Sequence, residues 1–109
     1  MPKTFYIDFD RVIHDIDHPV EGRKMGPPME GAIFGMQQLR EAGHHIIVFT
    51  TRATNERSIK VVMDWLDYYQ CPYDGVTNIK GKADAYVDDL AVHHISWDQT
   101  MMLLFEQEV

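Results

Sequence analysis

Two aspartates stand two places apart near the N-terminus, in the segment "YIDFDRVIH" that spans residues 6–14. Asp8 and Asp10 follow a short apolar run, and side chains two places apart on an extended strand point to the same face. Two carboxylates held so close repel each other, which raises the pKa of one of them. Such a pair serves either a metal ion or a reaction that needs one ionised and one protonated carboxyl group.

Three later apolar segments also end in side chains that carry chemistry: Thr50 and Thr51, then Lys80, then Asp88 and Asp89. If the segments are parallel strands, their carboxyl ends lie along one edge of a sheet, where ligands of open α/β sheets bind. Several carboxylates in one pocket need a cation, and oxygen ligands favour a hard ion such as Mg²⁺. A hydroxyl and an ammonium group beside that ion suit a phosphate group.

The elements that position these residues alternate along the chain. Short apolar runs predict strands over residues 5–9, 44–50, 74–78 and 84–89, with a fifth over 92–96. Helical spacing predicts helices from about residue 29 to Gly43, over 55–69, and over 97–106. Residues 11–28, rich in Pro and Gly, are predicted to be irregular. The alternation is typical of a parallel sheet with helices on both faces, an α/β fold of three layers, α/β/α.

The second helix is predicted to begin with a cap at Thr54 or Asn55 and to end before Pro72. Its apolar residues at helical spacing define the face expected to be buried: Ile59, Val62, Met63, Leu66 and Tyr69. The two tryptophans, Trp65 and Trp97, show no role in the sequence beyond packing.

The bulk composition predicts one cytoplasmic domain over residues 1–109. The chain has 45% hydrophobic and 25% charged residues, which is ordinary for a globular protein. Its net charge of −7 argues against general nucleic-acid binding. The single cysteine, Cys71, cannot form an internal disulfide. No signal-peptide pattern and no apolar run of bilayer length is present, so no membrane association is expected.

The order of the motifs resembles the haloacid dehalogenase superfamily of phosphotransferases. That family's pattern is Asp-x-Asp-x-Val/Thr, then a Thr or Ser that ends the next strand, then a Lys, then an acidic pair. The chain supplies "DFDRV" at 8–12, Thr50, Lys80 and "DD" at 88–89, in that order. The resemblance spans nearly the whole chain. It implies a Rossmann-like fold and a Mg²⁺-dependent phosphatase that cleaves a phosphomonoester through an aspartyl-phosphate.

The resemblance also implies a role for each matching residue. Asp8 is then the nucleophile, and Asp10 protonates the leaving oxygen and later deprotonates the attacking water. Thr50, with Thr51 beside it, binds the phosphoryl oxygens, and Lys80 balances their charge. The ion is held by Asp8, by the backbone carbonyl of Asp10 and by the acidic pair Asp88 and Asp89, with Asp89 favoured as the direct ligand.

The chain departs from the family's pattern in several places. Arg11 stands where many relatives have Gly, Lys82 competes with Lys80 for the phosphate, and no further carboxylate follows the acidic pair closely. No cap domain is expected, because only residues 11–28 fill the gap after the first strand. An open site suits a bulkier phosphorylated substrate, or a homo-oligomer in which a neighbouring subunit acts as the lid. The expected substrate is a small-molecule phosphate ester or such a bulkier phosphorylated molecule.

Two other functions are consistent with parts of the pattern. A non-catalytic relative that binds metal or phosphate as a regulatory module is favoured by Arg11 and the missing cap. A receiver domain of two-component signalling is disfavoured by motif order, because receivers carry the acidic pair on the first strand. Arg23 and Arg52 are interpreted as ordinary surface arginines, and the histidine pairs 44–45 and 93–94 are not expected to bind zinc, since adjacent strand residues face opposite ways.

Overall fold

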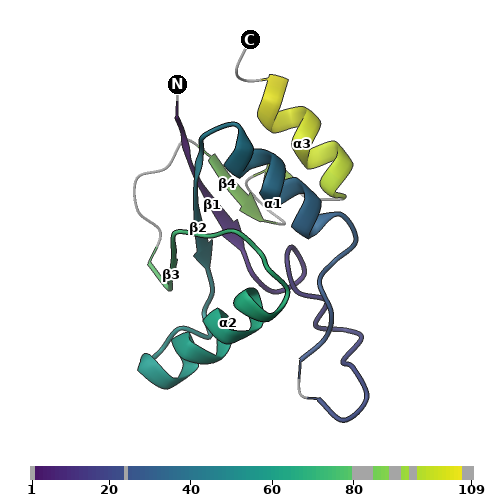
Figure 1. The fold of residues 1–109 in the computed structure, drawn as a ribbon, viewed down its shortest axis with the longest axis vertical. Helices are drawn as coiled ribbons and strands as arrows, with labels where there is room; N and C mark the ends of the chain where they lie inside the picture. The colour runs from purple at the N-terminus through teal and green to yellow at the C-terminus, as the bar shows by residue number, and fades with distance from the viewer. Residues whose placement is uncertain (1, 24, 80–84, 89–91, 94–95, 107–109) are drawn as a thin grey trace.

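The fold is a parallel sheet with three helices, seen in a computed structural model that describes residues 2–23, 25–79, 85–88, 92–93 and 96–106 (Figure 1). The elements follow in the order β1 (Thr4–Asp8), α1 (Ala32–Glu41), β2 (His45–Phe49), α2 (Glu56–Tyr68), β3 (Gly75–Thr77), β4 (Ala85–Asp88), β5 (Val92–His93) and α3 (Trp97–Glu106). The strands form one sheet in the order β3-β2-β1-β4-β5, and all neighbouring strands run parallel. The expected strands, helices and α/β class are confirmed.

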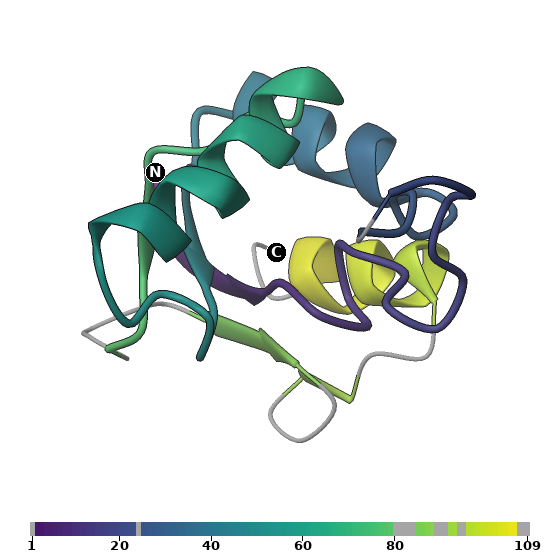
Figure 2. The same ribbon diagram turned by 90° about the horizontal axis from the view of Figure 1, so that it is seen from below.

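The two faces of the sheet differ in burial. Phe5 pairs with Ile46 and Ile7 with Val48, and all four side chains are buried. The alternate positions on β1 and β2 are half-buried or exposed. All three helices pack on the buried face, as Figure 2 shows. Within the described part of the chain the helices therefore form one layer, and the second helical layer of the expected α/β/α arrangement is not among these residues.

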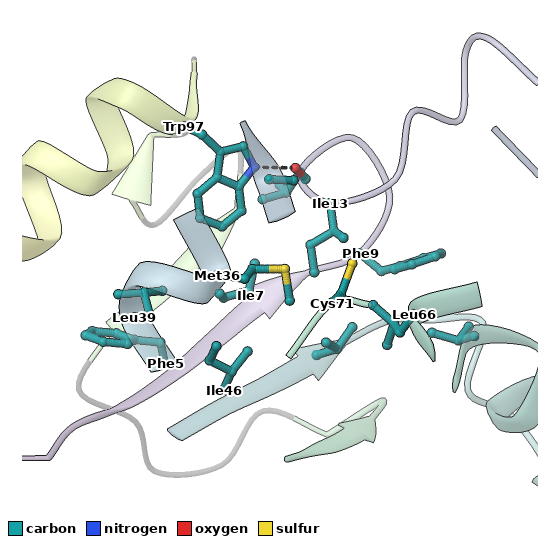
Figure 3. Close-up of a cluster of buried hydrophobic side chains, with 14 of the residues drawn as sticks. Phe5, Ile7, Phe9, Ile13, Met36, Leu39, Ile46, Leu66, Cys71 and Trp97 are labelled. Carbon is teal, nitrogen blue, oxygen red and sulfur yellow. Dashed lines mark hydrogen bonds between the residues drawn. The ribbon is translucent and has the colours of Figure 1, made fainter. Parts of the chain in front are cut away.

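Among the described residues, one apolar core lies between the sheet and the helices (Figure 3). Met36 and Leu39 of α1, Leu66 of α2 and Leu104 of α3 are almost fully buried in it. Burying one such side chain contributes about 1.5–3 kcal/mol. Helices α1 and α3 approach closely at Gly35, where a Cβ atom would lie 2.4 Å from the Trp97 ring. This contact brings the last helix onto the same layer as the first.

The helices follow local sequence rules, with two differences from the sequence prediction: the start of α1 and the buried face of α2. Helix α2 begins with a reciprocal capping box, in which Asn55 accepts a hydrogen bond from the Ser58 backbone and Ser58 accepts one from the Asn55 backbone. Helix α1 begins later than expected because Gly31, with φ of 82°, precedes it in the left-handed conformation. Met63 was predicted to be buried and is 37% exposed, and Trp65 lies on the buried face of α2 instead.

The irregular segment 11–28, called here the flap, is fastened to the helices by the two tryptophans. Trp97 Nε1 donates to the Val12 carbonyl at 2.8 Å, and Trp65 Nε1 donates to the Gly26 carbonyl at 2.9 Å. Further backbone bonds, such as Asp15 N to Pro27 O at 2.9 Å, close the flap on itself. The interpretation of both tryptophans as packing residues alone is therefore wrong, because each also donates a hydrogen bond that fixes the flap.

Replacing Gly26 by Ala is expected to destabilise the protein. A Cβ atom there would overlap the backbone carbonyl of Asp15, which cannot move aside as a flexible side chain would. Overpacking of this kind lowers the free energy of unfolding by about 1–3 kcal/mol or more, which urea denaturation measures. Gly75→Ala is the matched control, because its Cβ would meet only the end of Ile47 at an ordinary 3.7 Å. Equal stability of the two variants would contradict the close packing of the flap.

Candidate functional site

The central position of β1 brings three of the predicted residues to one edge of the sheet. Strand β1 lies between β2 and β4, and Asp8 is its last residue. Thr50 follows β2 directly. Asp88 ends β4, one register step beyond the pair of Ile7 and Val87. The predicted meeting of strand ends is therefore confirmed for these positions, whereas Lys80, Lys82 and Asp89 lie outside the described residues.

A cavity of about 300 Å³ opens at this edge. Four of the predicted site residues line it: Asp8, Asp10, Thr50 and Thr51. The flap contributes Arg11, Val12 and Ile16 to the lining. The described part of the chain therefore brings both aspartates and both threonines around one space that is open to a ligand.

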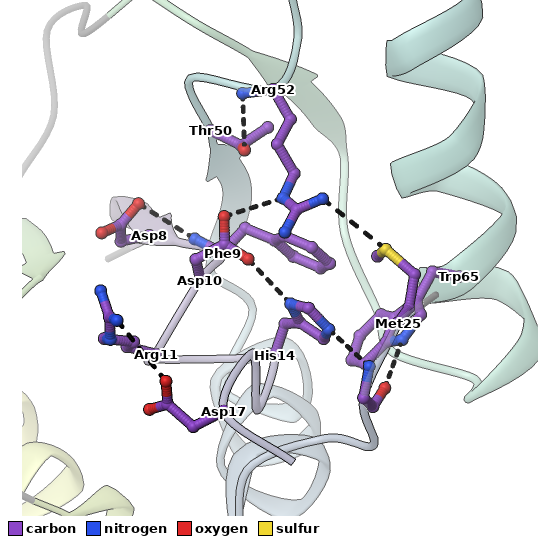
Figure 4. Close-up of polar contacts among 11 residues, drawn as sticks. Asp8, Phe9, Asp10, Arg11, His14, Asp17, Met25, Thr50, Arg52 and Trp65 are labelled. Atoms are coloured by element: carbon purple, nitrogen blue, oxygen red, sulfur yellow. Dashed lines mark hydrogen bonds and ion pairs between the residues drawn. The ribbon is translucent and has the colours of Figure 1, made fainter. Parts of the chain in front are cut away.

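Asp8 is held at the end of its strand by a local hydrogen bond. Its Oδ1 accepts from the backbone N–H of Phe9 at 3.1 Å (Figure 4). The same N–H donates to the Phe49 carbonyl at 3.0 Å. The side chain of the next residue, Phe9, is fully buried in the core. Asp8 itself is half-buried and lines the cavity.

Thr50 has a hydroxyl that suits a phosphoryl oxygen. Its side chain is buried, and its Oγ1 accepts from the backbone N–H of Arg52 at 3.1 Å. A hydroxyl has one donor and two acceptor positions, so this bond leaves the hydroxyl hydrogen for another acceptor. The backbone N–H of Thr50 donates to Thr77 O at 2.9 Å, which fixes the residue between β2 and β3. Thr51 is exposed at the rim.

Asp10 is held from two sides, as Figure 4 shows. Its Oδ1 lies 2.8 Å from Nδ1 of His14, and its Oδ2 accepts from Nε of Arg52 at 2.8 Å. Burial by itself raises the pKa of the Asp10 carboxyl, but these two hydrogen bonds and the guanidinium charge outweigh it and hold the pKa below its usual range. In this arrangement Asp10 is an ionised acceptor.

His14 and Arg52 are members of the site that sequence reasoning missed. Arg52 was interpreted as an ordinary surface arginine, which is wrong, because its guanidinium forms an ion pair with Asp10. Its place two residues after Thr50, at the same strand end, was the available signal. Arg23 lies elsewhere, with its guanidinium 5.0 Å from the centre of the Tyr68 ring on α2.

Arg11 adopts a left-handed backbone conformation at the wall of the cavity. Its φ is 70°, in the left-handed region that glycine enters without strain. Its side chain is 68% exposed and pairs with Asp17 at 3.5 Å. Arg11 therefore adds a positive charge to the wall of the cavity without occupying it.

The donors for a metal ion are described in part. Asp8 offers a carboxylate and Asp10 a backbone carbonyl, both of them hard oxygen ligands of the kind that Mg²⁺ takes. Within the described ranges, no three His, Cys, Asp or Glu side chains form a group that could hold a metal. The donor chemistry fits Mg²⁺, and the ligand favoured from the sequence, Asp89, lies outside these ranges.

Comparison with known proteins identifies the fold. No family model matches the chain, and no curated protein matches it. A solved structure of a conserved protein from Bacteroides thetaiotaomicron superposes with a TM-score of 0.78 over 100% of this chain and 94% of that one, at 19% identity. A crystal structure of a target protein from Vibrio cholerae superposes with a TM-score of 0.60 over 98% of this chain and 99% of that one, at 22% identity. At such identities the likeness shows a shared α/β fold.

Proposed function

We propose that the protein is a Mg²⁺-dependent phosphatase of the haloacid dehalogenase type, which cleaves a phosphomonoester through an aspartyl-phosphate. The observation that supports it most is the cavity lined by Asp8, Asp10 and Thr50, which come from two adjacent strand ends in the order of the family's motifs. The Asp-x-Asp pair alone is common in proteins, whereas its convergence with the threonine of the next strand is not expected by chance.

In the proposed reaction each residue has a distinct role. Asp8 attacks phosphorus in line and displaces the alcohol, which receives its proton from Asp10. Water then attacks the aspartyl-phosphate after Asp10 takes its proton, which releases phosphate and restores Asp8. Thr50 donates its hydroxyl hydrogen to a phosphoryl oxygen, and Lys80 balances the charge on the phosphate. The hydrogen bonds at Asp10 favour its ionised form, which suits the second step, in which it acts as a base.

Mg²⁺ is proposed as the cofactor. The residues that would hold it are Asp8, through its carboxylate, Asp10, through its backbone carbonyl, and the acidic pair Asp88 and Asp89. The ion would neutralise charge on the phosphate and the nucleophile. The measurement with a readout besides activity is a thermal melt with Mg²⁺ or a chelator, because binding to the folded state alone raises the melting temperature.

A panel of phosphate esters, assayed with Mg²⁺ and with a chelator, tests the function. Sugar phosphates, nucleoside monophosphates and a phosphorylated oligonucleotide end form the first set. Release of phosphate from at least one of them is expected, and the chelator should stop it. The proposal would be contradicted if the folded protein released no phosphate from any of them and its melting temperature did not change with Mg²⁺.

Replacing Arg11 by Gly is expected to weaken substrate binding with little change in kcat. The glycine accepts the left-handed backbone without strain, so the variant removes the charge at the cavity wall together with the exposed ion pair to Asp17. An exposed charge contributes up to about 1 kcal/mol, so KM should rise up to about fivefold. Steady-state kinetics at fixed Mg²⁺ measures both constants. A fall in kcat with KM unchanged would place Arg11 in the chemistry rather than in binding.

The alternative is a non-catalytic module that binds metal or phosphate. The held position of Asp10 supports it, because a carboxylate engaged by His14 and Arg52 is less ready to give up a proton. Binding of Mg²⁺ and inorganic phosphate without turnover of any ester would decide for this function. Turnover that depends on Asp8 would decide against it.

A Rossmann-like fold without a cap, cytoplasmic localisation and a homo-oligomer belong to the same proposal. The helices cover one face of the sheet, so a second copy of the chain is a candidate to cover the other and to shield the site. No helix in the described ranges has the length and apolar character needed to cross a bilayer. Sedimentation over a range of concentrations tests the oligomer, and a strict monomer with full activity would exclude it.

A further inference from the structure

His14 is an almost fully buried polar side chain next to the site. It is 1% exposed, and its ring stacks on Phe9 with centroids 4.9 Å apart and planes 13° from parallel. The His14 ring also contacts the Trp65 ring edge-to-face, with centroids 5.4 Å apart. Because two aromatic walls fix the ring plane, both ring nitrogens have defined directions.

Each nitrogen of His14 has one hydrogen-bond partner, and together they determine the tautomer. Nε2 lies 2.8 Å from the backbone nitrogen of Gly26, which can only donate. Nε2 is therefore the acceptor and carries no hydrogen, and the ring proton resides on Nδ1. Nδ1 lies 2.8 Å from Oδ1 of Asp10 and donates to it. The orientation of the ring is not ambiguous, since a flip would remove both bonds.

We infer that His14 is a positioning residue, which fixes the Asp10 carboxylate at the edge of the cavity through a tautomer set by the flap backbone. Its Nδ1–H directs Oδ1 of Asp10, while Arg52 directs Oδ2 from the other side. With both oxygens held, the carboxylate cannot rotate about its Cβ–Cγ bond. The flap thus takes part in the site through Gly26, His14 and Asp10, in addition to lining it. The kinetic consequence rests on the proposed phosphatase function, whereas the tautomer does not.

Two substitutions of His14 separate positioning from packing. Asn places an amide N–H where Nδ1 was, which keeps the bond to Asp10 and loses the one to Gly26. Gln places its amide oxygen where Nε2 was, which keeps the bond from Gly26 and loses the one to Asp10. Both remove the ring that stacks on Phe9, so both should lose similar stability, measured by urea denaturation.

The kinetic result expected is a difference in kcat between these variants. His14→Gln should lower kcat on the order of 10²-fold with KM little changed, because a displaced reacting group loses rate rather than binding. His14→Asn should keep a kcat at least about tenfold above that of His14→Gln. A kcat of His14→Gln equal to or above that of His14→Asn would overturn the inference, because His14 would then act only by anchoring the flap.

His18→Asn is the matched control, since His18 also lies on the flap with its Nδ1 bonded to a carboxylate, Asp15, at 3.0 Å. It is exposed and does not line the cavity. Its kcat and stability should equal those of the wild-type protein. A loss of kcat as large as that of His14→Gln would show that any disturbance of the flap slows the reaction, and would also overturn the inference.

Nitrogen NMR of the wild-type protein tests the tautomer whether or not the protein is a phosphatase. The two-bond ¹⁵N–¹H pattern of His14 should show a protonated Nδ1 and a bare Nε2, and the Nδ1 shift should move in Asp10→Asn but not in Asp15→Asn. An unprotonated Nδ1 would overturn the inference. If no ester is turned over, the proposed function fails, and the NMR result alone then supports or overturns the positioning of Asp10 by His14.

Discussion

Asp8→Asn is expected to abolish turnover while the protein remains folded. The amide has nearly the volume of the carboxylate, and its oxygen can still accept the hydrogen bond from the Phe9 backbone. It cannot form the aspartyl-phosphate, so kcat should fall by at least about 10³-fold. Phosphate release from the best ester of the panel measures the loss, and a urea titration shows that the fold is kept.

The control for Asp8→Asn is the same exchange at an exposed carboxylate. Asp64 on α2 pairs with Lys60 at 3.0 Å, is 62% exposed and does not line the cavity. Asp64→Asn should leave kcat and KM unchanged. Activity of Asp8→Asn close to that of Asp64→Asn would end the covalent mechanism, and would favour the non-catalytic module if no ester is turned over by either protein.

The elements were predictable because each depends on neighbours in sequence. The alternation of buried Phe5 and Ile7 defines β1, and the Asn55 cap defines the start of α2. Strand ends then placed Asp8, Asp10 and Thr50 at one edge, since parallel strands share their direction. This part of the site follows from local patterns and from one rule of topology.

The hydrogen bonds from His14 and Arg52 to Asp10 were not predictable, because the one from His14 depends on the path of an irregular segment. His14 reaches Asp10 only because the flap folds back on itself, so that Gly26 meets Nε2 of His14. That path depends on hydrogen bonds donated by Trp65 and Trp97 from two helices far away in sequence. No periodic pattern in residues 11–28 encodes these contacts.

The expectation of helices on both faces had a signal against it in the sequence. A parallel crossover needs a dozen or more residues, usually with a helix. The connections from β1 to β2 and from β2 to β3 have that length and carry α1 and α2, which lie on one face (Figure 2). The connection from β3 to β4 has only residues 78–84. Its length favours a sheet with helices mainly on one side.

Asp10→Asn is expected to be the second most damaging substitution of the site. Loss of a proton-transfer group lowers the rate by about 10²–10⁴-fold. The amide also disturbs the pair of donors that holds it, because His14 Nδ1–H and Arg52 Nε–H would share one acceptor oxygen and one of them would face an N–H group. Both effects act on kcat, and the second also lowers stability.

Asp15→Asn separates these effects, because the two aspartates are closely matched. Asp15 lies close to Asp10 in the sequence and has a similar side-chain exposure, 24% against 25%. It also accepts from a histidine Nδ1, at 3.0 Å. It does not line the cavity, so Asp15→Asn should keep the wild-type kcat.

The comparison is made as kcat per folded molecule, at a temperature where urea titration shows both variants folded. If Asp10→Asn then keeps more than about a tenth of the wild-type kcat, Asp10 transfers no proton in the rate-limiting step, since general acid–base catalysis is worth more than that. The hydrogen bonds from His14 and Arg52 would in that case serve the fold of the flap and not the reaction.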